Sequence, residues 1–305
     1  MPIAISTGNQ EGAPKANAAS LRNRGFEFSL GWRDQISDFK YSAVLNLTTL
    51  SNKVLNLGYG KEYLNNGQAQ TKPGNALSQF YLRRTNGIFR TQEEIDNYVT
   101  SEGKPIMIQG KRPQLGDVRY LDLDDNGEIT DNDREICGSP WAKMQMSLML
   151  NASWKNFDFN MMWNGQFGNK IYNVEKWQGR LFSDNSNYIR FKSGEEPYQV
   201  NPNSDTPRII YGDSRNSLDS DRFLENGSYL RMKNISIGYN FKKSWLINIG
   251  VENLRIYAAG NNLITFTSYS GLDPDFVNTN IWNSGTDNFS YPNTRSVMFG
   301  LDLTF

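Results

Sequence analysis

The chain has 305 residues, and its 32 Lys and Arg balance its 32 Asp and Glu, so no basic excess favours nucleic-acid binding. It contains no histidine and one cysteine, Cys137, which excludes Ser-His-Asp and Cys-His catalysis, His-ligated zinc or haem, and an internal disulfide framework. Aromatic residues make up 13% of the chain, and with many glycines and asparagines they favour turn-rich β-structure over a helical bundle.

Neither a membrane-spanning helix nor a secretory leader is predicted. The sequence has no run of about 18 apolar residues. The first residues, Met1 to Ile5, are followed at once by polar residues, and no basic segment precedes them. These observations do not exclude a transmembrane β-barrel, which has a weaker sequence pattern.

Apolar and polar residues alternate along seven segments, which predicts strands with one apolar and one polar face. In the last segment, Val297, Phe299 and Leu301 share one face, while Gly300 and Asp302 share the other. Several segments last about 10 residues, the length that crosses a bilayer at a tilt. The seven segments are residues 24–33, 39–50, 142–154, 157–168, 229–241, 251–261 and 297–305.

The links between these strands alternate between short and very long. The short links are at 34–38, 155–156 and 242–250, and the long ones are at 51–141, 169–227 and 262–293. Short turns on one side and long loops on the other are typical of outer-membrane barrels, with the turns in the periplasm and the loops outside the cell. Residues 80–89 and 116–121 are either short strands inside the first long loop or two further wall strands, so about seven to nine strands are predicted.

Several aromatic residues are expected near the ends of these strands, where outer-membrane barrels carry aromatic girdles at the two membrane surfaces. These residues are Trp32, Trp154, Phe157, Trp163 and Tyr239.

One motif carries a recognisable chemistry. Residues 122–133 match the D-x-[DN]-x-[DN]-G pattern of a calcium loop, in which Gly127 makes the sharp turn. Calcium prefers clustered hard oxygens, and this spacing directs them at one centre. The alternative is a tight acidic turn that closes without metal. The predicted ligands of a structural Ca²⁺ ion are Asp122, Asp124, Asn126, the backbone carbonyl of Glu128, and Asp133.

Other candidate residues give weaker signals. Loop aromatics that are able to stack on sugars are Trp177, Tyr188, Trp282 and Tyr291, and the alternative for each is packing within its own loop. Acidic pairs such as Asp273 and Asp275 occur in glycosidases, but more often they are solvated loop charges. Cys137 is interpreted as a small buried apolar residue.

Several sequence motifs, taken in their order along the chain, resemble the carboxyl-terminal part of the SusC/RagA family of TonB-dependent outer-membrane transporters. The resemblance covers residues 3 to 305. It is carried by residues 23–27 (NRGFE), 116–127 (GDVRYLDLDDNG), 165–173 (GQFGNKIYN), 229–239 (YLRMKNISIGY), 260–267 (GNNLITFT) and 271–274 (GLDP).

The resemblance implies an all-β fold in which residues 1–305 form the carboxyl-terminal portion of a 22-stranded antiparallel transmembrane barrel. It also implies import of large nutrients, oligosaccharides or peptides, across the bacterial outer membrane without catalysis. The implied partners are a SusD-like surface lipoprotein, and the TonB–ExbB–ExbD complex acting through an amino-terminal part. The family's signal peptide and plug domain have no counterpart in the sequence. Phe305 matches the terminal signal for barrel assembly.

Two other functions fit part of the pattern. A soluble secreted β-sandwich that binds carbohydrate and carries a calcium loop would show the same alternation and aromatics. A glycosidase is the second alternative, and it predicts hydrolysis of oligosaccharides. In the transporter interpretation, the passage is lined by polar residues such as Asn151, Asn160, Asn164 and Gln166.

Overall fold

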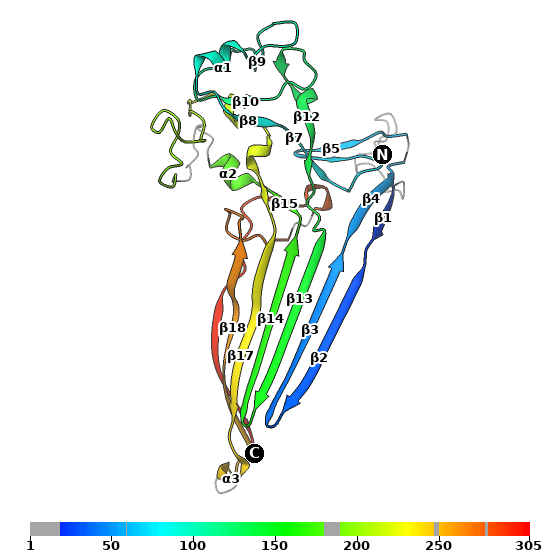
Figure 1. Ribbon diagram of the computed structural model, residues 1–305, viewed down its shortest axis with the longest axis vertical. Coiled ribbons are helices and arrows are strands. Elements are labelled where there is room, and N and C mark those ends of the chain that lie inside the picture. Colours follow the sequence, from blue (N-terminus) through cyan, green and yellow to red (C-terminus); the bar gives the residue numbers. More distant parts are fainter. Residues whose placement is uncertain (1–18, 59, 180–189, 247–249, 278–279) are drawn as a thin grey trace, which may run out of the picture.

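A seven-stranded antiparallel sheet dominates the computed structural model, which describes residues 19–58, 60–179, 190–246, 250–277 and 280–305. Its strand order, β2-β3-β13-β14-β17-β18-β20, follows the chain. The seven predicted strands all lie in this sheet, side by side in a long and narrow surface (Figure 1). They are β2 (Glu27–Ile36), β3 (Phe39–Thr49), β13 (Met144–Trp154), β14 (Phe157–Phe167), β17 (Tyr229–Asn240), β18 (Asn253–Thr267) and β20 (Ser296–Thr304).

Beyond one end of the sheet, short elements form a separate cap (Figure 1). β1 (Ser20–Arg24) and β4 (Ser51–Asn56) pair with each other and continue the β2–β3 hairpin toward this cap. The strands of the cap are β5 (Leu64–Asn66), β6 (Ala69–Thr71), β7 (Gln79–Arg83), β8 (Thr85–Ile88), β9 (Met107–Ile108), β10 (Val118–Tyr120), β11 (Glu128–Ile129), β12 (Arg134–Gly138), β15 (Lys170–Asn173), β16 (Leu224–Asn226) and β19 (Thr286–Asp287). Its helices are α1 (Gln92–Asp96), α2 (Val174–Gln178), η2 (Asp131–Asp133), η3 (Arg215–Ser217), η4 (Asp221–Phe223) and η6 (Ile281–Asn283).

The position of β7, β8 and β10 resolves the alternative left open for residues 80–89 and 116–121. These strands pair with β6, β12 and one another, and none of them joins the seven-stranded sheet. They are therefore short strands inside the first long connection.

All short connections lie at one end of the sheet and all long ones at the other (Figure 1). The two-residue turn at 155–156 joins β13 to β14 and places Lys155 in the left-handed region, with φ of 52°. The link between β17 and β18 contains α3 (Lys243–Leu246) at that same end. The predicted asymmetry of turns and loops is thus present.

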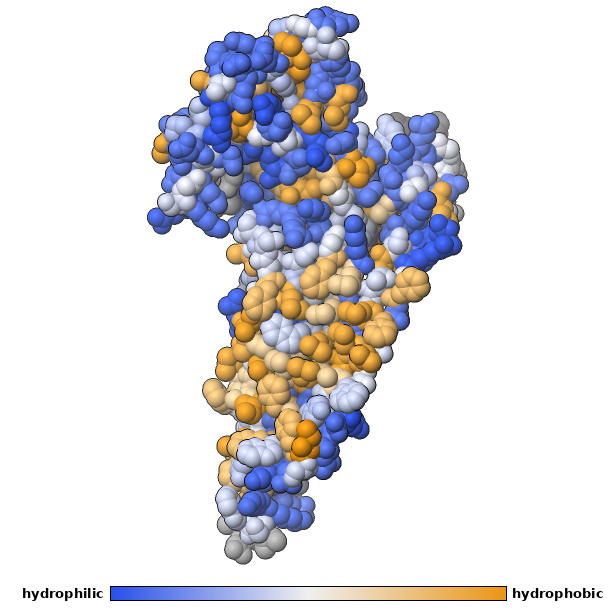
Figure 2. Space-filling view, viewed as in Figure 1, coloured by the Kyte–Doolittle hydropathy of each residue, from blue (hydrophilic) through white to orange (hydrophobic). Residues whose placement is uncertain are grey.

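One face of the sheet is apolar across all seven strands. The register aligns a complete row of apolar side chains and one glycine, namely Trp32, Ala43, Leu150, Met161, Ile235, Gly260 and Val297. Large side chains on this face are exposed, Phe299 to 84% and Val297 to 64%. Figure 2 shows a broad hydrophobic band over the sheet and a largely hydrophilic cap above it.

The opposite face carries polar side chains that bond across the strands. Asn160 donates to Asn151 at 2.6 Å, and Asn151 donates to Ser42 at 3.4 Å. On the same face, Asn46 donates to Ser147 at 3.1 Å. Asparagine suits these positions because its amide both donates and accepts between neighbouring strands.

An aromatic row marks the turn end of the apolar face. The register aligns Phe39, Trp154, Phe157 and Tyr239, and the Phe157 and Tyr239 rings meet edge to face at 4.9 Å. The prediction for Trp32 was wrong in position, because it pairs with Ala43 well inside the sheet. The error arose because β2 extends to Ile36, beyond the predicted end of the strand.

The cap has its own small hydrophobic cores, unlike the sheet. One cluster joins Phe89, Tyr98, Ile108 and Tyr120 among others, and a second is built around Phe80, Leu82 and Tyr172. Within the described residues, no helix has both the length and the apolar character that crossing a membrane requires.

The two faces of β13 predict opposite tolerance to charge. Leu148 lies on the apolar face and its neighbour Met149 on the polar face. Leu148→Arg is expected to lower the free energy of unfolding in a phospholipid bilayer by about 2–4 kcal/mol. Met149→Arg, the matched control, is expected to cost far less because Met149 lies on the same face of β13 as Ser147 and Asn151, which would not contact lipid.

Both substitutions are introduced into the protein that carries this chain. Denaturant unfolding in vesicles then compares the free energies of unfolding of the two variants. Equal costs for the two substitutions would contradict the assignment of the faces.

Candidate metal loop and loop surfaces

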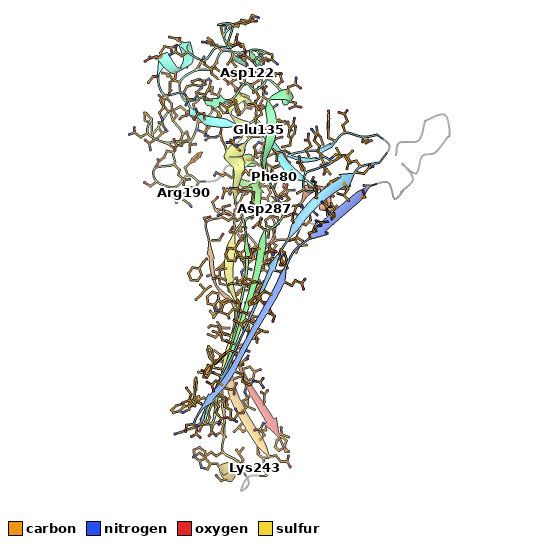
Figure 3. The ribbon with its side chains drawn as sticks, turned by 45° about the vertical axis from the view of Figure 1, so that its right-hand side comes forward. Phe80, Asp122, Glu135, Arg190, Lys243 and Asp287 are labelled. Carbon is orange, nitrogen blue, oxygen red and sulfur yellow. The ribbon has the colours of Figure 1, made fainter. Side chains whose placement is uncertain are left out.

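The predicted calcium loop lies in the cap, where Figure 3 labels Asp122 far from the turn end of the sheet. Asp122, Asp124 and Asp133 each offer one carboxylate oxygen, and these oxygens lie within 4.8 Å of one another. The structure therefore brings together three of the five predicted ligand residues through their carboxylates. Oxygens gathered at this spacing are the arrangement that a hard cation such as Ca²⁺ prefers.

Backbone amides hold the loop in this shape. Gly127 adopts φ of 86°, and its N–H donates to Asp122 Oδ2 at 2.9 Å. Directly afterwards, β11 pairs in parallel with β9, and Ile129 of β11 is buried in the cap core. The turn thus passes into a short strand that is anchored by packing.

Asp133 closes the loop from its other end. Its side chain is fully buried, and its two oxygens accept from the backbone N–H of Leu123 at 2.8 Å and of Thr130 at 2.6 Å. Asp133, at the last position of the motif, thus links the beginning and the end of the loop. One carboxylate joins segments ten residues apart.

Asp122 carries a polar atom that no described residue satisfies. Its Oδ1 is buried and has no hydrogen-bond partner in the part of the chain that the structure describes. Burial raises the pKa of Asp122 above the ordinary value, the Gly127 amide opposes this, and the negative charge of Asp133 adds to the increase. A buried acceptor without a donor is costly, and a bound cation would remove that cost.

The two remaining predicted ligands differ in their surroundings. Asn126 Oδ1 accepts from the Glu128 amide at 2.8 Å, and its Nδ2 donates to Asp124 Oδ2 at 2.8 Å. The Glu128 carboxylate accepts from the Gly110 amide at 2.8 Å, so this side chain binds elsewhere in the cap. The motif had assigned only the Glu128 backbone carbonyl as a ligand.

The loop aromatics have different environments. Trp177 packs partly buried against the Phe80 cluster, and its indole N–H donates to the Ser217 carbonyl at 2.7 Å. Trp282 is 38% exposed and Tyr291 is 86% exposed. Tyr188 lies outside the described residues. Trp282 and Tyr291 therefore present surface to a ligand, whereas Trp177 supports the loop.

The interpretation of Asp273 as a solvated loop charge was wrong, because this side chain is only 6% exposed. It forms an ion pair with the equally buried Arg231 of β17 and accepts from the Asn293 amide at 2.9 Å. Lys233 of β17 pairs with Asp275 at 2.7 Å. These contacts tie the connection after β18 to the sheet.

The sequence contains a signal for these two ion pairs that sequence reasoning missed. Arg231 and Lys233 are two residues apart on one strand, and Asp273 and Asp275 are two residues apart in the loop. Equal spacing of opposite charges permits two parallel ion pairs. Only the fold brings the segments together, because they lie more than 40 positions apart.

Cys137 is partly buried against the Phe80 cluster, and burial raises the pKa of its thiol to about 11. A neutral thiol in such surroundings is a poor nucleophile. This agrees with the predicted role as a small apolar residue.

The chain is similar in sequence to TonB-dependent receptors. It is 32% identical to TonB-dependent receptor P3 of Formosa agariphila over 309 residues, and 28% identical to TonB-dependent receptor SusC of Bacteroides thetaiotaomicron over 298 residues. Each alignment covers 95% of this chain but 29% and 27% of the relative, so the chain spans less than a third of their length. No protein-family model matches the chain.

The fold is similar to that of a solved transporter. The structure of the RagAB peptide transporter matches with a TM-score of 0.77 and 19% sequence identity, and the match covers 100% of this chain and 31% of that chain. The same complex, described as a peptide importer in the closed-closed state, matches with a TM-score of 0.75. The open seven-stranded sheet is therefore a partial barrel of this architecture.

The buried ion pair predicts a strong dependence of loop order on Arg231. Arg231→Met leaves the Asp273 carboxylate buried without its cation, which typically costs about 3–5 kcal/mol. We expect faster amide hydrogen exchange at residues 271–275 and at Asn293, with exchange in β13 and β14 unchanged.

The double variant Arg231→Met with Asp273→Asn is the control, because it removes the unpaired charge. Partial recovery of protection is expected in it. Unchanged exchange in the single variant would exclude the anchoring role.

Proposed function

We propose that this chain, as one of the SusC/RagA-like TonB-dependent receptors, forms part of the wall of an outer-membrane importer of large nutrients. The observation that carries the proposal is the two-faced sheet. Its apolar face would contact lipid, and its Asn-rich face would line the passage. Asn164 and Gln166 continue that polar face toward the cap. The chain would act in transport and carry out no catalysis.

Oligosaccharides are the substrate class that we propose, with peptides as the second class. A wall of amides and hydroxyls offers donors and acceptors in equal measure, which matches sugar hydroxyls. The exposed Trp282 and Tyr291 in the third long connection would add aromatic surface for contact with the substrate.

The cap would meet a SusD-like surface lipoprotein. It lies beyond the loop end of the sheet, and its surface is largely hydrophilic (Figure 2), as suits a surface that contacts a partner in water. TonB–ExbB–ExbD would supply energy through parts of the receptor other than this segment. Phe305, which is 80% exposed beyond the last strand, would be read by the barrel-assembly machinery.

A soluble β-sandwich is less well supported. A sandwich buries the apolar face of one sheet against a second sheet. Among the described residues, no second sheet covers Phe299 or Leu301, which are 84% and 60% exposed. A glycosidase is also less well supported, because Asp273 is held in an ion pair and the named relatives are receptors.

The cap would also hold a structural Ca²⁺ ion. The three clustered carboxylates and the unsatisfied Asp122 oxygen support this assignment. A cation there would fix the loop between β10 and β12, and so the position of η2, without taking part in chemistry.

Cellular fractionation tests the transport proposal. Outer membranes of the source cells should contain a detergent-requiring polypeptide much larger than 34.8 kDa that yields these peptides by mass spectrometry and co-purifies with a lipoprotein. A soluble species near 34.8 kDa would overturn the proposal and favour the β-sandwich.

Calorimetry with CaCl₂ tests the metal loop on the purified receptor. Asp122→Asn is expected to weaken calcium binding by roughly tenfold or more, because it removes a charged ligand. Asp125→Asn is the matched control, since Asp125 lies in the same loop but accepts from the Ser101 amide at 2.9 Å. Equal loss in both variants would mean general electrostatic attraction.

The pH dependence of calcium binding follows from the raised pKa of Asp122. Protons compete with the cation for the carboxylates, so affinity should fall as pH falls, beginning at a higher pH than for an ordinary aspartate. Without metal, the raised pKa means that the charged form is disfavoured in the fold, so Asp122→Asn should stabilise the metal-free protein at neutral pH. Thermal unfolding in EDTA measures this; destabilisation there would contradict it.

A further inference from the structure

A cavity of about 470 Å³ lies on the face of the β12-β7-β6-β5 sheet that is opposite the Phe80 core. Phe80 and Leu82 of β7 point into that core and are fully buried. Tyr81 between them therefore projects from the other face, where it lines the cavity together with Ile136, its partner in register. The volume lies in the range of small-molecule sites, about 300–1,000 Å³.

Two cationic side chains that line the cavity carry a hydrogen-bond donor or a charge that no described residue pairs with. Arg134 Nε is buried and has no hydrogen-bond partner among the described residues, although another nitrogen of its guanidinium pairs with Asp131 at 2.8 Å. Lys72 is exposed at the rim and forms no ion pair within the described part of the chain. A buried donor without an acceptor and an unpaired ammonium together favour a ligand that carries anionic oxygens.

The rest of the lining suits a sugar. Tyr63, which is 51% exposed, and Tyr81 offer aromatic surface with hydroxyls at the tip. Asn75 and Asn132 offer amides that both donate and accept. An extended peptide would need a free strand edge to pair with. The edge strand β5 has only three residues, Leu64–Asn66, which is too short for that mode.

We propose that this cavity binds an anionic sugar unit of an oligosaccharide, one that carries a carboxylate or a sulfate ester. The Lys72 ammonium and the Arg134 guanidinium would contact the anionic group, and the tyrosines and amides would contact the ring and its hydroxyls. The assignment rests on the proposed function, since it names the class of nutrient that the importer takes.

The cavity wall is continuous with the acidic loop. Asp131 and Asn132 of η2 line the cavity, and η2 begins after Thr130, whose amide donates to Asp133. Asp131 also pairs with Arg83 at 2.6 Å, so two arginines hold this wall in place. A rigid wall lowers the conformational cost of binding.

Calorimetric titration of the detergent-purified receptor tests the proposal. The probes are an oligogalacturonate, a sulfated oligosaccharide, a neutral cello-oligosaccharide and an acidic peptide. At least one anionic sugar should bind more tightly than the neutral one. Lys72→Gln should weaken that binding by roughly tenfold, whereas Lys53→Gln, an exposed lysine on β4 outside the cavity, should leave it unchanged.

A second variant distinguishes specific binding in the cavity from general electrostatic attraction. Tyr81→Leu should weaken binding of the anionic sugar with no change in the salt dependence of its affinity. Equal affinity for neutral and anionic sugars, equal effects of the two lysine variants, or tighter binding of the acidic peptide would overturn the proposal. If the receptor still fractionates with the outer membrane and imports oligosaccharide, only the subsite fails; absence from that membrane would remove the proposed function itself.

Discussion

The structure depends on side-chain alternation along seven paired strands. Each strand places successive side chains on opposite faces, so a single register error would exchange the faces along a whole strand. The register instead aligns complete rows, and the row through Trp32, Leu150 and Val297 crosses all seven strands without a polar side chain. An apolar surface of this breadth is stable only where water is excluded from it.

The polar face meets a different requirement. Its asparagines and serines bond to one another from strand to strand, as Asn151 does with Asn160. Ion pairs then fix the long connections to the same face, with Arg231 and Lys233 holding the segment around Asp273. The sheet therefore serves as a rigid base on which the loops are positioned.

The cap is organised by packing and by charge. Small cores such as the one around Tyr120 support short strands, and between them lies an acidic loop whose carboxylates are held by backbone amides. The helix η2 belongs both to that loop and to the wall of the Tyr81 cavity. The proposed cation and the proposed sugar would consequently be separated by one turn of chain.

Local pattern alone determined the wall strands, the alternation of short and long links, and the candidate metal residues. Each follows from residue spacing within one segment: the period of two in β20, and the placement of Asp122, Asp124 and Gly127 along one turn. The aromatic Trp32 was misplaced because alternation fixes which face a residue occupies but not where its strand ends.

Only the tertiary structure decided which distant residues meet. The burial of Asp273 against Arg231, the packing of Trp177 into a core and the cavity between Lys72 and Arg134 join segments separated by dozens of residues. Sequence spacing carries no information about such contacts, because the paths of the long connections are set by packing and hydrogen bonding in three dimensions. The strands could therefore be predicted from the sequence, whereas the proposed binding surfaces of the cap could not.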